Sequence, residues 1–176
     1  MLAQGVIHAD ETPAQMLAPG EKKTHLASVC AYSTTPFSAL KVMVYDFSPS
    51  RAGEHARNFL GQWNGKLVCD DFAGYKASFE KGITEIACMV HALRKFFDLH
   101  VANTSRPAEL ALRSIGGLYE VERQARAMSD EDRWRIRQEK AAPILKPLHD
   151  WMLAQRDSLM DQQWPKPWTA LNAGQR

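Results

Sequence analysis

Two apolar segments that end in aspartate contain the residues best suited to chemistry. Asp10 follows the run GVIHA, and Asp70 and Asp71 follow the run GKLVC. Each run is typical of a strand, so each carboxylate is expected where a strand stops and the chain turns. Carboxylates from two strands, with open coordination positions between them, are what a two-metal phosphodiester-cleaving centre needs. Their oxygen ligands favour Mg²⁺ or Mn²⁺.

An aspartate at the end of a strand also has a simpler interpretation. Such residues more often accept hydrogen bonds in a turn or cap a helix. One of them would indicate nothing by itself, whereas two in matching contexts favour a shared metal site. Glu11 and Thr12 follow Asp10 directly and either support such a site or begin a turn or a helix.

The elements that must hold these acids are strands and one helix in the first half of the chain. Three β-rich runs separated by turn-prone residues predict an antiparallel meander. A helix with an apolar stripe follows, capped by Ser50 and stopped by Gly65. The next strand is expected to run parallel to its neighbour, because a helix crosses between them. The expected strands are 5–10, 24–33, 39–47, 66–70 and 83–90.

The second half of the chain changes to helical periodicity. Ser105 is expected to open a long helix, and Ser129 with Asp132 forms a capping box for the next one. Pro143 and Pro147 are expected to bound a short helix. The sequence thus predicts three parts: a core of strands with one helix (1–91), a helical insertion or appended layer (92–155) and an irregular tail (156–176).

Four blocks of sequence carry a resemblance to a known family. In order, they are HADETPAQM, SPSRAGEHARNFLGQWNGKLVCDDFAGY, CMVHALRKFFD and IGGLYEVERQAR. In order and spacing they resemble the catalytic domain of insertion sequence 66 family transposases, from about Gly5 to about Gln155. The block from Ser48 to Tyr75 is the most specific part.

The resemblance implies a fold, an activity and a site. The fold class is α/β, a ribonuclease H-like mixed sheet with an all-helical C-terminal half. A DDE-type triad of acids would cut and join DNA with two divalent ions, Mg²⁺ or Mn²⁺. Asp10 corresponds to the first acid and Asp70, rather than Asp71, to the second. DNA, as element ends and target, is the implied partner, and a homo-oligomer is compatible with the sequence.

The third acid of the triad is the hardest to assign. Glu122 continues the helical stripe that contains Ile115 and Leu118, so its carboxylate faces the apolar side and needs a partner. Glu122 is either the catalytic acid or an ion-pair partner of Arg126 at i+4. In the second case, the chain lacks its third acid.

Basic side chains supply the candidate nucleic-acid contacts. His91, Arg94 and Lys95 share one helical face and resemble the family's His-x-x-Arg-Lys-Phe run, which is suited to phosphate contacts. The alternative is a solvated basic face with aromatic neighbours packed inward. Arg51 begins the first helix, where backbone N–H groups also favour phosphate, although a solvated helix face is an alternative there too.

Composition adds limits on the class of protein. The 176 residues are 45% hydrophobic and 24% charged, as in ordinary globular proteins, and a net charge of +2 permits DNA binding without arguing for it. No apolar run approaches the roughly 20 residues that span a bilayer, and no secretion signal is recognisable, so we expect a cytoplasmic protein without a membrane partner. Cys30, Cys69 and Cys88 are expected to be buried free thiols.

The sequence therefore predicts the catalytic region of a DNA transposase, as a truncated copy of a longer protein. Two alternatives stay open. One is a DNA-binding or dimerising remnant without activity, and the other is a metal-dependent nuclease that cuts strands without joining them.

Overall fold

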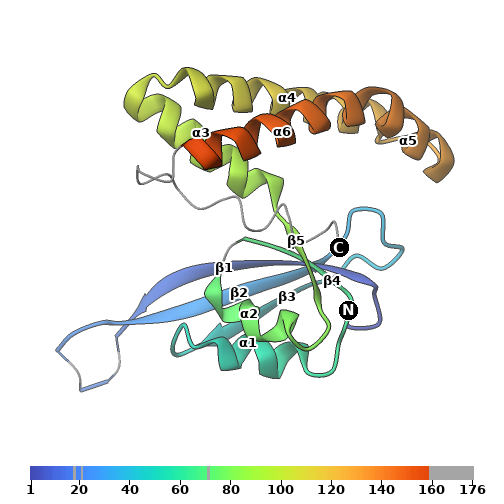
Figure 1. The fold of residues 1–176 in the computed structure, drawn as a ribbon. Helices are drawn as coiled ribbons and strands as arrows, with labels where there is room; N and C mark the ends of the chain where they lie inside the picture. Colours follow the sequence, from blue (N-terminus) through green and yellow to red (C-terminus); the bar gives the residue numbers. More distant parts are fainter. Residues whose placement is uncertain (18, 21, 71, 159–176) are drawn as a thin grey trace. The chain divides into compact units, whose positions relative to one another are not determined.

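The structure is a computed structural model that describes residues 1–158 except 18, 21 and 71 (Figure 1). Two compact units divide the described chain between Cys88 and Met89. The first unit contains all the strands, and the second contains the long helices. Asp71 and most of the expected tail (156–176) lie outside the described residues.

The first unit is built on a five-stranded mixed sheet with the spatial order β3-β2-β1-β4-β5. Strands β1, β2 and β3 form the predicted antiparallel meander, and β4 runs parallel to β1, as the crossover helix predicted. Strand β5 extends the sheet parallel to β4. The strands are β1 (Val6–Met16), β2 (His25–Thr34), β3 (Met43–Ser48), β4 (Lys66–Cys69) and β5 (Thr84–Ala87).

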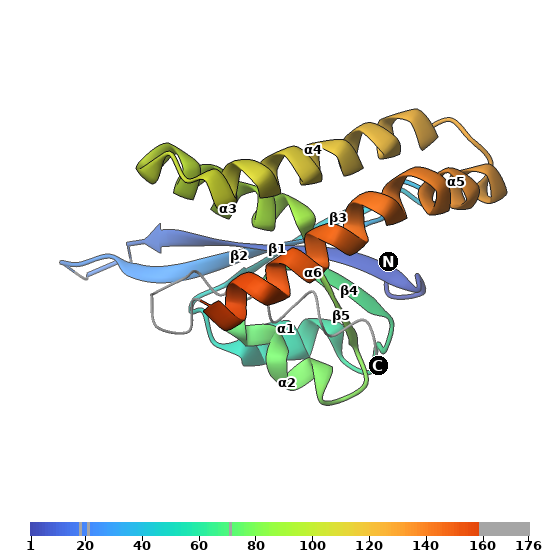
Figure 2. The ribbon, with the colours of Figure 1, turned by 45° about the horizontal axis from the view of Figure 1, so that its top comes forward.

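Helices α1 (Gly53–Leu60) and α2 (Lys76–Phe79) lie on the same side of this sheet (Figure 2). Alternate residues of the central strands face α1 and form the core with its buried side chains. Tyr32 is fully buried there and stacks on Phe59, with ring centroids 3.9 Å apart. The buried core residues are Ile7, Ala9, Cys30, Tyr32, Ala56, Leu60, Leu67, Cys69, Tyr75 and Ile83.

Both ends of α1 differ from the prediction. The helix begins at Gly53 without a side-chain cap, so the assignment of Ser50 as its cap was wrong. It ends at Leu60 rather than at Gly65, because Gly61 adopts a positive φ of 56°. Glycine reaches that conformation without a steric penalty, so it ends the helix earlier than the apolar stripe suggested.

Strand β1 does not stop at Asp10, as the sequence had suggested, but continues to Met16. It pairs with β2 along this length, from Ile7↔Thr34 to Met16↔His25, whereas its pairing with β4 covers only Val6–His8. The long pairing with β2 keeps the chain extended through Pro13. Proline is tolerated in a strand where its missing N–H would point away from the paired strand. Asp10 therefore lies inside a strand, just beyond the end of the pairing with β4.

The described part of the second unit, residues 89–158, consists of helices and turns. Ser105 and Ser129 cap α4 and α5 as predicted, since their hydroxyl oxygens accept hydrogen bonds from the amides of Ala108 and Asp132. The helices are α3 (Met89–Asn103), α4 (Arg106–Ala125), α5 (Asp130–Ile136) and α6 (Ala142–Ser158). Within the described chain, no helix is both long and apolar enough to cross a bilayer.

Pro143 and Pro147 do not bound a short helix, contrary to the prediction. A π-helical turn at Arg137–Ala141 joins α5 to α6, Pro143 stands in the first turn of α6, and Pro147 lies inside the helix. A first-turn proline costs little because that N–H has no intrahelical partner. Burial of Leu148 and Met152 on α6 helps to offset the hydrogen bond lost at Pro147.

Candidate metal and nucleic-acid site

Asp10 lies on β1, and Asp70 directly follows β4, the strand that pairs parallel with the start of β1. Each paired residue of β1 faces the β4 residue 60 positions later, and the last pair is His8↔Val68, two residues before Asp10 and Asp70. Adjacent paired strands are about 4.8 Å apart, so the two segments run side by side up to that pair. Asp10 is exposed, and Asp70, directly after Cys69, is half-buried.

The sequence left open whether Asp70 is a turn residue or a metal ligand, and its surroundings bear on both roles. Its Oδ1 accepts a hydrogen bond of 3.1 Å from the Phe72 amide, as expected of a turn residue. That bond also restricts the orientation of the carboxylate. On the neighbouring strand, burial lowers the pKa of His8, which favours a neutral imidazole two residues before Asp10.

The donor set suits one hard divalent cation better than a complete two-metal centre. The described residues contain no group of three or more His, Cys, Asp or Glu side chains placed to hold a metal ion. Two carboxylates are nevertheless sufficient protein ligands for Mg²⁺, which usually keeps several waters and binds through one or two carboxylates. Asp10 and Asp70 are the two carboxylates that could hold such an ion, with water or a substrate phosphate to complete its coordination.

Glu11 and Arg51 form an ion pair that the sequence did not predict. The Glu11 side chain is only 2% exposed, and Arg51 binds it through two hydrogen bonds, Nε to Oε1 at 3.0 Å and Nη2 to Oε2 at 2.7 Å. The Ser28 hydroxyl donates a third bond to Oε1 at 2.6 Å. The hydrogen bond to Glu11 is the main reason why the pKa of Arg51 is raised, and the charge of Asp70 contributes.

Strand periodicity was the signal for this pair. Ile7, Ala9 and Glu11 alternate along β1 on its buried face, so a long β1 makes Glu11 an inward-facing carboxylate that needs a cation. Arg51 was predicted to contact nucleic acid. The structure instead directs two of its N–H groups to Glu11, while the side chain as a whole is 44% exposed.

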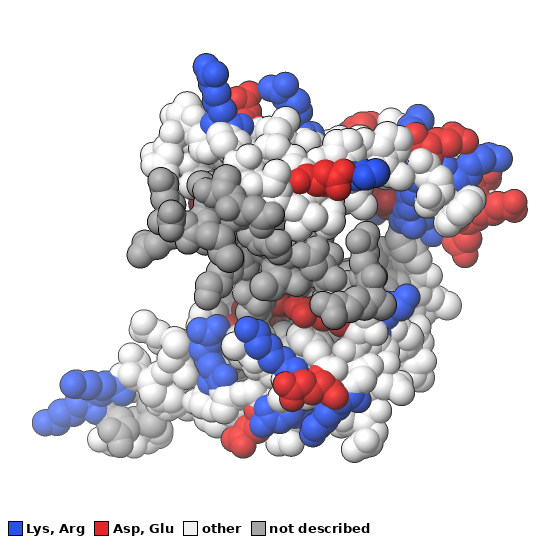
Figure 3. All heavy atoms as spheres, in the orientation of Figure 1, with Lys and Arg blue, Asp and Glu red and all other residues white. Residues whose placement is uncertain are grey.

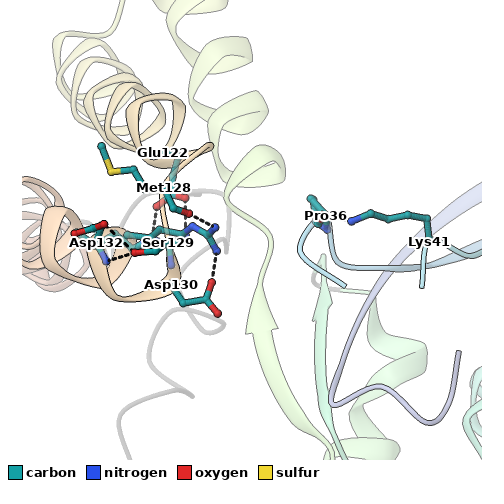
Figure 4. A network of polar contacts seen from close by, with 9 residues as sticks. Pro36, Lys41, Glu122, Met128, Ser129, Asp130 and Asp132 are labelled. Atoms are coloured by element: carbon teal, nitrogen blue, oxygen red, sulfur yellow. Dashed lines mark hydrogen bonds and ion pairs between the residues drawn. The ribbon is translucent and has the colours of Figure 1, made fainter. Parts of the chain in front are cut away.

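Glu122 lies on α4 in the second unit, where its partner is Arg137 rather than the predicted Arg126. Arg137 donates from Nε and Nη2 to the two carboxylate oxygens, both at 2.7 Å, and this lowers the pKa of Glu122. The pair borders a largely apolar cavity of about 360 Å³. Figure 4 shows Glu122 beside Met128, Ser129 and the first turn of α5, which carries Asp130 and Asp132.

The three basic candidates on α3 differ in exposure. Arg94 and Lys95 are exposed, whereas His91 is half-buried. Of the two aromatic residues that follow, Phe96 is buried and Phe97 is 56% exposed, so only one of them packs inward. Elsewhere, basic side chains gather at the tip of the β1–β2 ribbon, where Lys22 and Lys23 are exposed (Figure 3).

Comparison with known families accounts for almost the whole chain. The model described as "Transposase IS66 family" matches residues 1–170. The chain belongs to the IS66 transposase family. No solved structure matches this IS66 transposase chain.

Its relatives include longer proteins of Sinorhizobium fredii (strain NGR234). Uncharacterized protein y4jD is 31% identical over 191 residues, covering 97% of this chain and 37% of its own. Uncharacterized protein y4hP is 30% identical over 172 residues, covering 87% of this chain and 31% of its own. The chain thus spans about a third of the length of these relatives.

Proposed function

We propose that this IS66 transposase chain contributes a divalent-metal site to the cleavage and joining of DNA strands. The observation that carries the proposal is the parallel pairing of β1 with β4, because Asp10 lies on β1 and Asp70 directly follows β4. Bound Mg²⁺ or Mn²⁺ would supply an activated water and neutralise charge on the phosphate. The protein's own contribution is to hold the two carboxylates at a fixed spacing on a rigid sheet.

We also propose that the first unit is a ribonuclease H-like domain. Three antiparallel strands, a helix and two further parallel strands follow one another in the order expected for that fold. The sheet order β3-β2-β1-β4-β5 supports the assignment, because it makes β1 and β4 central neighbours. In the proposed fold, this arrangement would bring two acids 60 residues apart in sequence to one place.

DNA binding is assigned to exposed cations rather than to net charge. Arg94 and Lys95 on α3 are exposed and available to phosphates, and His91 shares their helical face. A net charge of +2 provides little nonspecific attraction by itself. Local clusters must therefore position the strand, and their contacts should weaken as salt concentration rises.

The assignment of Glu122 as the third acid stays a prediction. Its bidentate pair with Arg137 favours a structural role, since a carboxylate bound at both oxygens would have to exchange partners to reach a metal. The longer relatives have further chain in which another acid can reside. Replacement of Glu122 by glutamine separates the two roles.

Metal binding provides the first test. Electron paramagnetic resonance of free Mn²⁺ would be used to titrate the wild type and the variants Asp10→Asn, Asp70→Asn and Glu122→Gln. We expect each aspartate variant to lose at least about tenfold in Mn²⁺ affinity, because a carboxylate ligand is gone, and Glu122→Gln to match the wild type. Unchanged affinity in both aspartate variants would overturn the proposal.

A cleavage and strand-transfer assay on DNA carrying the element's ends then distinguishes the activities. Cleavage and joining, both lost in Asp10→Asn, support the transposase assignment. Cleavage without joining indicates a nuclease, and metal binding without either reaction indicates an inactive remnant. If Glu122→Gln abolishes strand transfer while Mn²⁺ affinity stays unchanged, Glu122 is the third acid.

A further inference from the structure

The buried carboxylate of Glu11 anchors an arginine next to the proposed metal site. Glu11 follows Asp10 on β1 but faces the core, where Ser28 and Arg51 satisfy it. A buried carboxylate without a partner is costly, so the position of Arg51 is strongly fixed. The two N–H groups that bind Glu11 lie in one plane, and this bidentate geometry orients the whole guanidinium.

The guanidinium of Arg51 also contacts the turn that follows β4. Its guanidinium carbon lies 5.3 Å from the centre of the Phe72 ring, within the range of a cation–π interaction. The Phe72 ring in turn packs edge-on against Tyr75, with centroids 5.3 Å apart, and Tyr75 is fully buried. Phe72 is therefore held between a fixed cation and the core.

Phe72 connects this packing to Asp70, because its amide donates the 3.1 Å hydrogen bond to Asp70 Oδ1. The same turn is pressed against the start of α1. A Cβ atom on Gly53 would lie 2.7 Å from the carbonyl oxygen of Gly74, so only glycine permits this approach. Arg51 precedes Gly53 by two residues and reaches the turn from the same segment.

We propose that Arg51, fixed by Glu11, is a positioning residue that orients the Asp70 carboxylate through Phe72. The inference rests on the proposed function, in which Asp70 holds a metal ion. It replaces the predicted phosphate contact of Arg51 with a role directed into the protein. Groups that orient a metal ligand commonly change metal affinity by 10- to 100-fold when they are lost.

The test compares matched arginine–glutamate pairs in the full chain. Arg51→Lys keeps the charge but loses the planar fork, and Phe72→Leu keeps the amide but loses the ring. Arg137→Lys makes the same change in the pair with Glu122 and serves as the control. Each variant is titrated with Mn²⁺, and ¹⁵N-phenylalanine labelling follows the Phe72 amide, whose chemical shift reports its hydrogen bond to Asp70.

We expect Arg51→Lys to shift the labelled amide of Phe72. Arg51→Lys and Phe72→Leu should both weaken Mn²⁺ binding about tenfold, while Arg137→Lys changes neither the amide shift nor the Mn²⁺ affinity. An unchanged amide and unchanged Mn²⁺ affinity in folded Arg51→Lys would overturn the proposal. So would a loss of DNA affinity without either change, which indicates a phosphate contact.

Failure of the metal proposal gives a different result. If the wild type binds no Mn²⁺, the site assignment fails, but the Phe72 amide still reports whether Arg51 positions Asp70. A shifted amide in Arg51→Lys then supports the positioning role alone, and an unshifted amide overturns it.

Discussion

The two bidentate arginine–glutamate pairs are nearly the same in chemistry and different in setting. In the first unit, Glu11 is 2% exposed and Arg51 44%, whereas in the second unit Glu122 is 43% exposed and Arg137 39%. Each arginine uses Nε and Nη2 on two carboxylate oxygens. Water can replace a lost partner of Glu122 but reaches Glu11 poorly. The first pair should therefore be essential to its unit and the second replaceable.

The largest expected effect is the removal of the cation from the buried pair. Arg51→Met keeps much of the side-chain volume but leaves the Glu11 carboxylate with Ser28 as its one side-chain partner among the described residues. Loss of one partner of a buried pair costs about 3 kcal/mol or more, and we expect a decrease of that size in the free energy of unfolding. Urea denaturation monitored by circular dichroism would measure it.

The double variant Glu11→Gln with Arg51→Met is the matched control. It removes the buried charge along with its partner, so it should regain a large part of the lost stability. A double variant as unstable as Arg51→Met alone would show that packing of the arginine side chain, rather than an uncompensated carboxylate, sets the effect.

Glycine substitutions give the next effect and have opposite signs in the two units. Gly53→Ala places a methyl group 2.7 Å from the Gly74 carbonyl oxygen, and we expect it to destabilise the first unit by about 2 kcal/mol. Gly116→Ala on α4 meets nothing within 4 Å and should stabilise that helix by about 0.5 kcal/mol. Thermal melts of both variants would check the signs, and a stable Gly53→Ala would refute the close packing of the turn on α1.

The half-exposed pair of Glu122 and Arg137 should contribute less to the free energy of unfolding, and its contribution should depend on pH. Glu122→Gln is expected to cost no more than about 1 kcal/mol at pH 7. Arg137 lowers the pKa of Glu122 in the folded state, so the contribution is complete above the unfolded pKa of about 4.3 and is lost as pH falls through the lower folded pKa. Unfolding curves of wild type and variant should therefore converge in acid, and a difference that does not shrink as pH falls contradicts the assignment.

The smallest expected effect is the loss of a surface ion pair, which gives a reference value for the stability that such pairs contribute. Arg113 and Glu109 form an i,i+4 pair on α4 with side chains 76% and 52% exposed. Arg113→Ala should change the free energy of unfolding by about 0.3 kcal/mol, less than loss of the Glu122 pair. Equal effects at the two sites, measured in the same urea series, would mean that the bidentate geometry of Glu122 adds nothing.

The sequence predicted the features that depend on local patterns. Strand runs and the helical crossover predicted that β4 runs parallel to β1. The hydroxyls of Ser105 and Ser129 predicted two helix starts. These features depend on residues close together in the chain, where periodicity and capping chemistry are direct evidence.

Features that depend on distant partners were not predicted. Arg51 meets Glu11 across 40 residues, and Glu122 meets Arg137 across 15, whereas sequence reasoning favoured Arg126 as the i+4 neighbour. The extension of β1 beyond Asp10 was missed because the apolar run ends there, while the pairing with β2 kept the strand extended. Tertiary contacts chose the partner in each case.

The extended part of β1 also affects the solubility of the protein. Among the described residues, β4 pairs with β1 only through Val6–His8, so no strand pairs with the remainder of β1 on that side. Backbone groups left open along a strand edge recruit other chains and promote aggregation. Pro13 brings no N–H to this stretch, which interrupts the hydrogen-bonding template for an incoming strand. The residue that looks like a strand breaker in the sequence thus limits edge-to-edge association between copies of the protein.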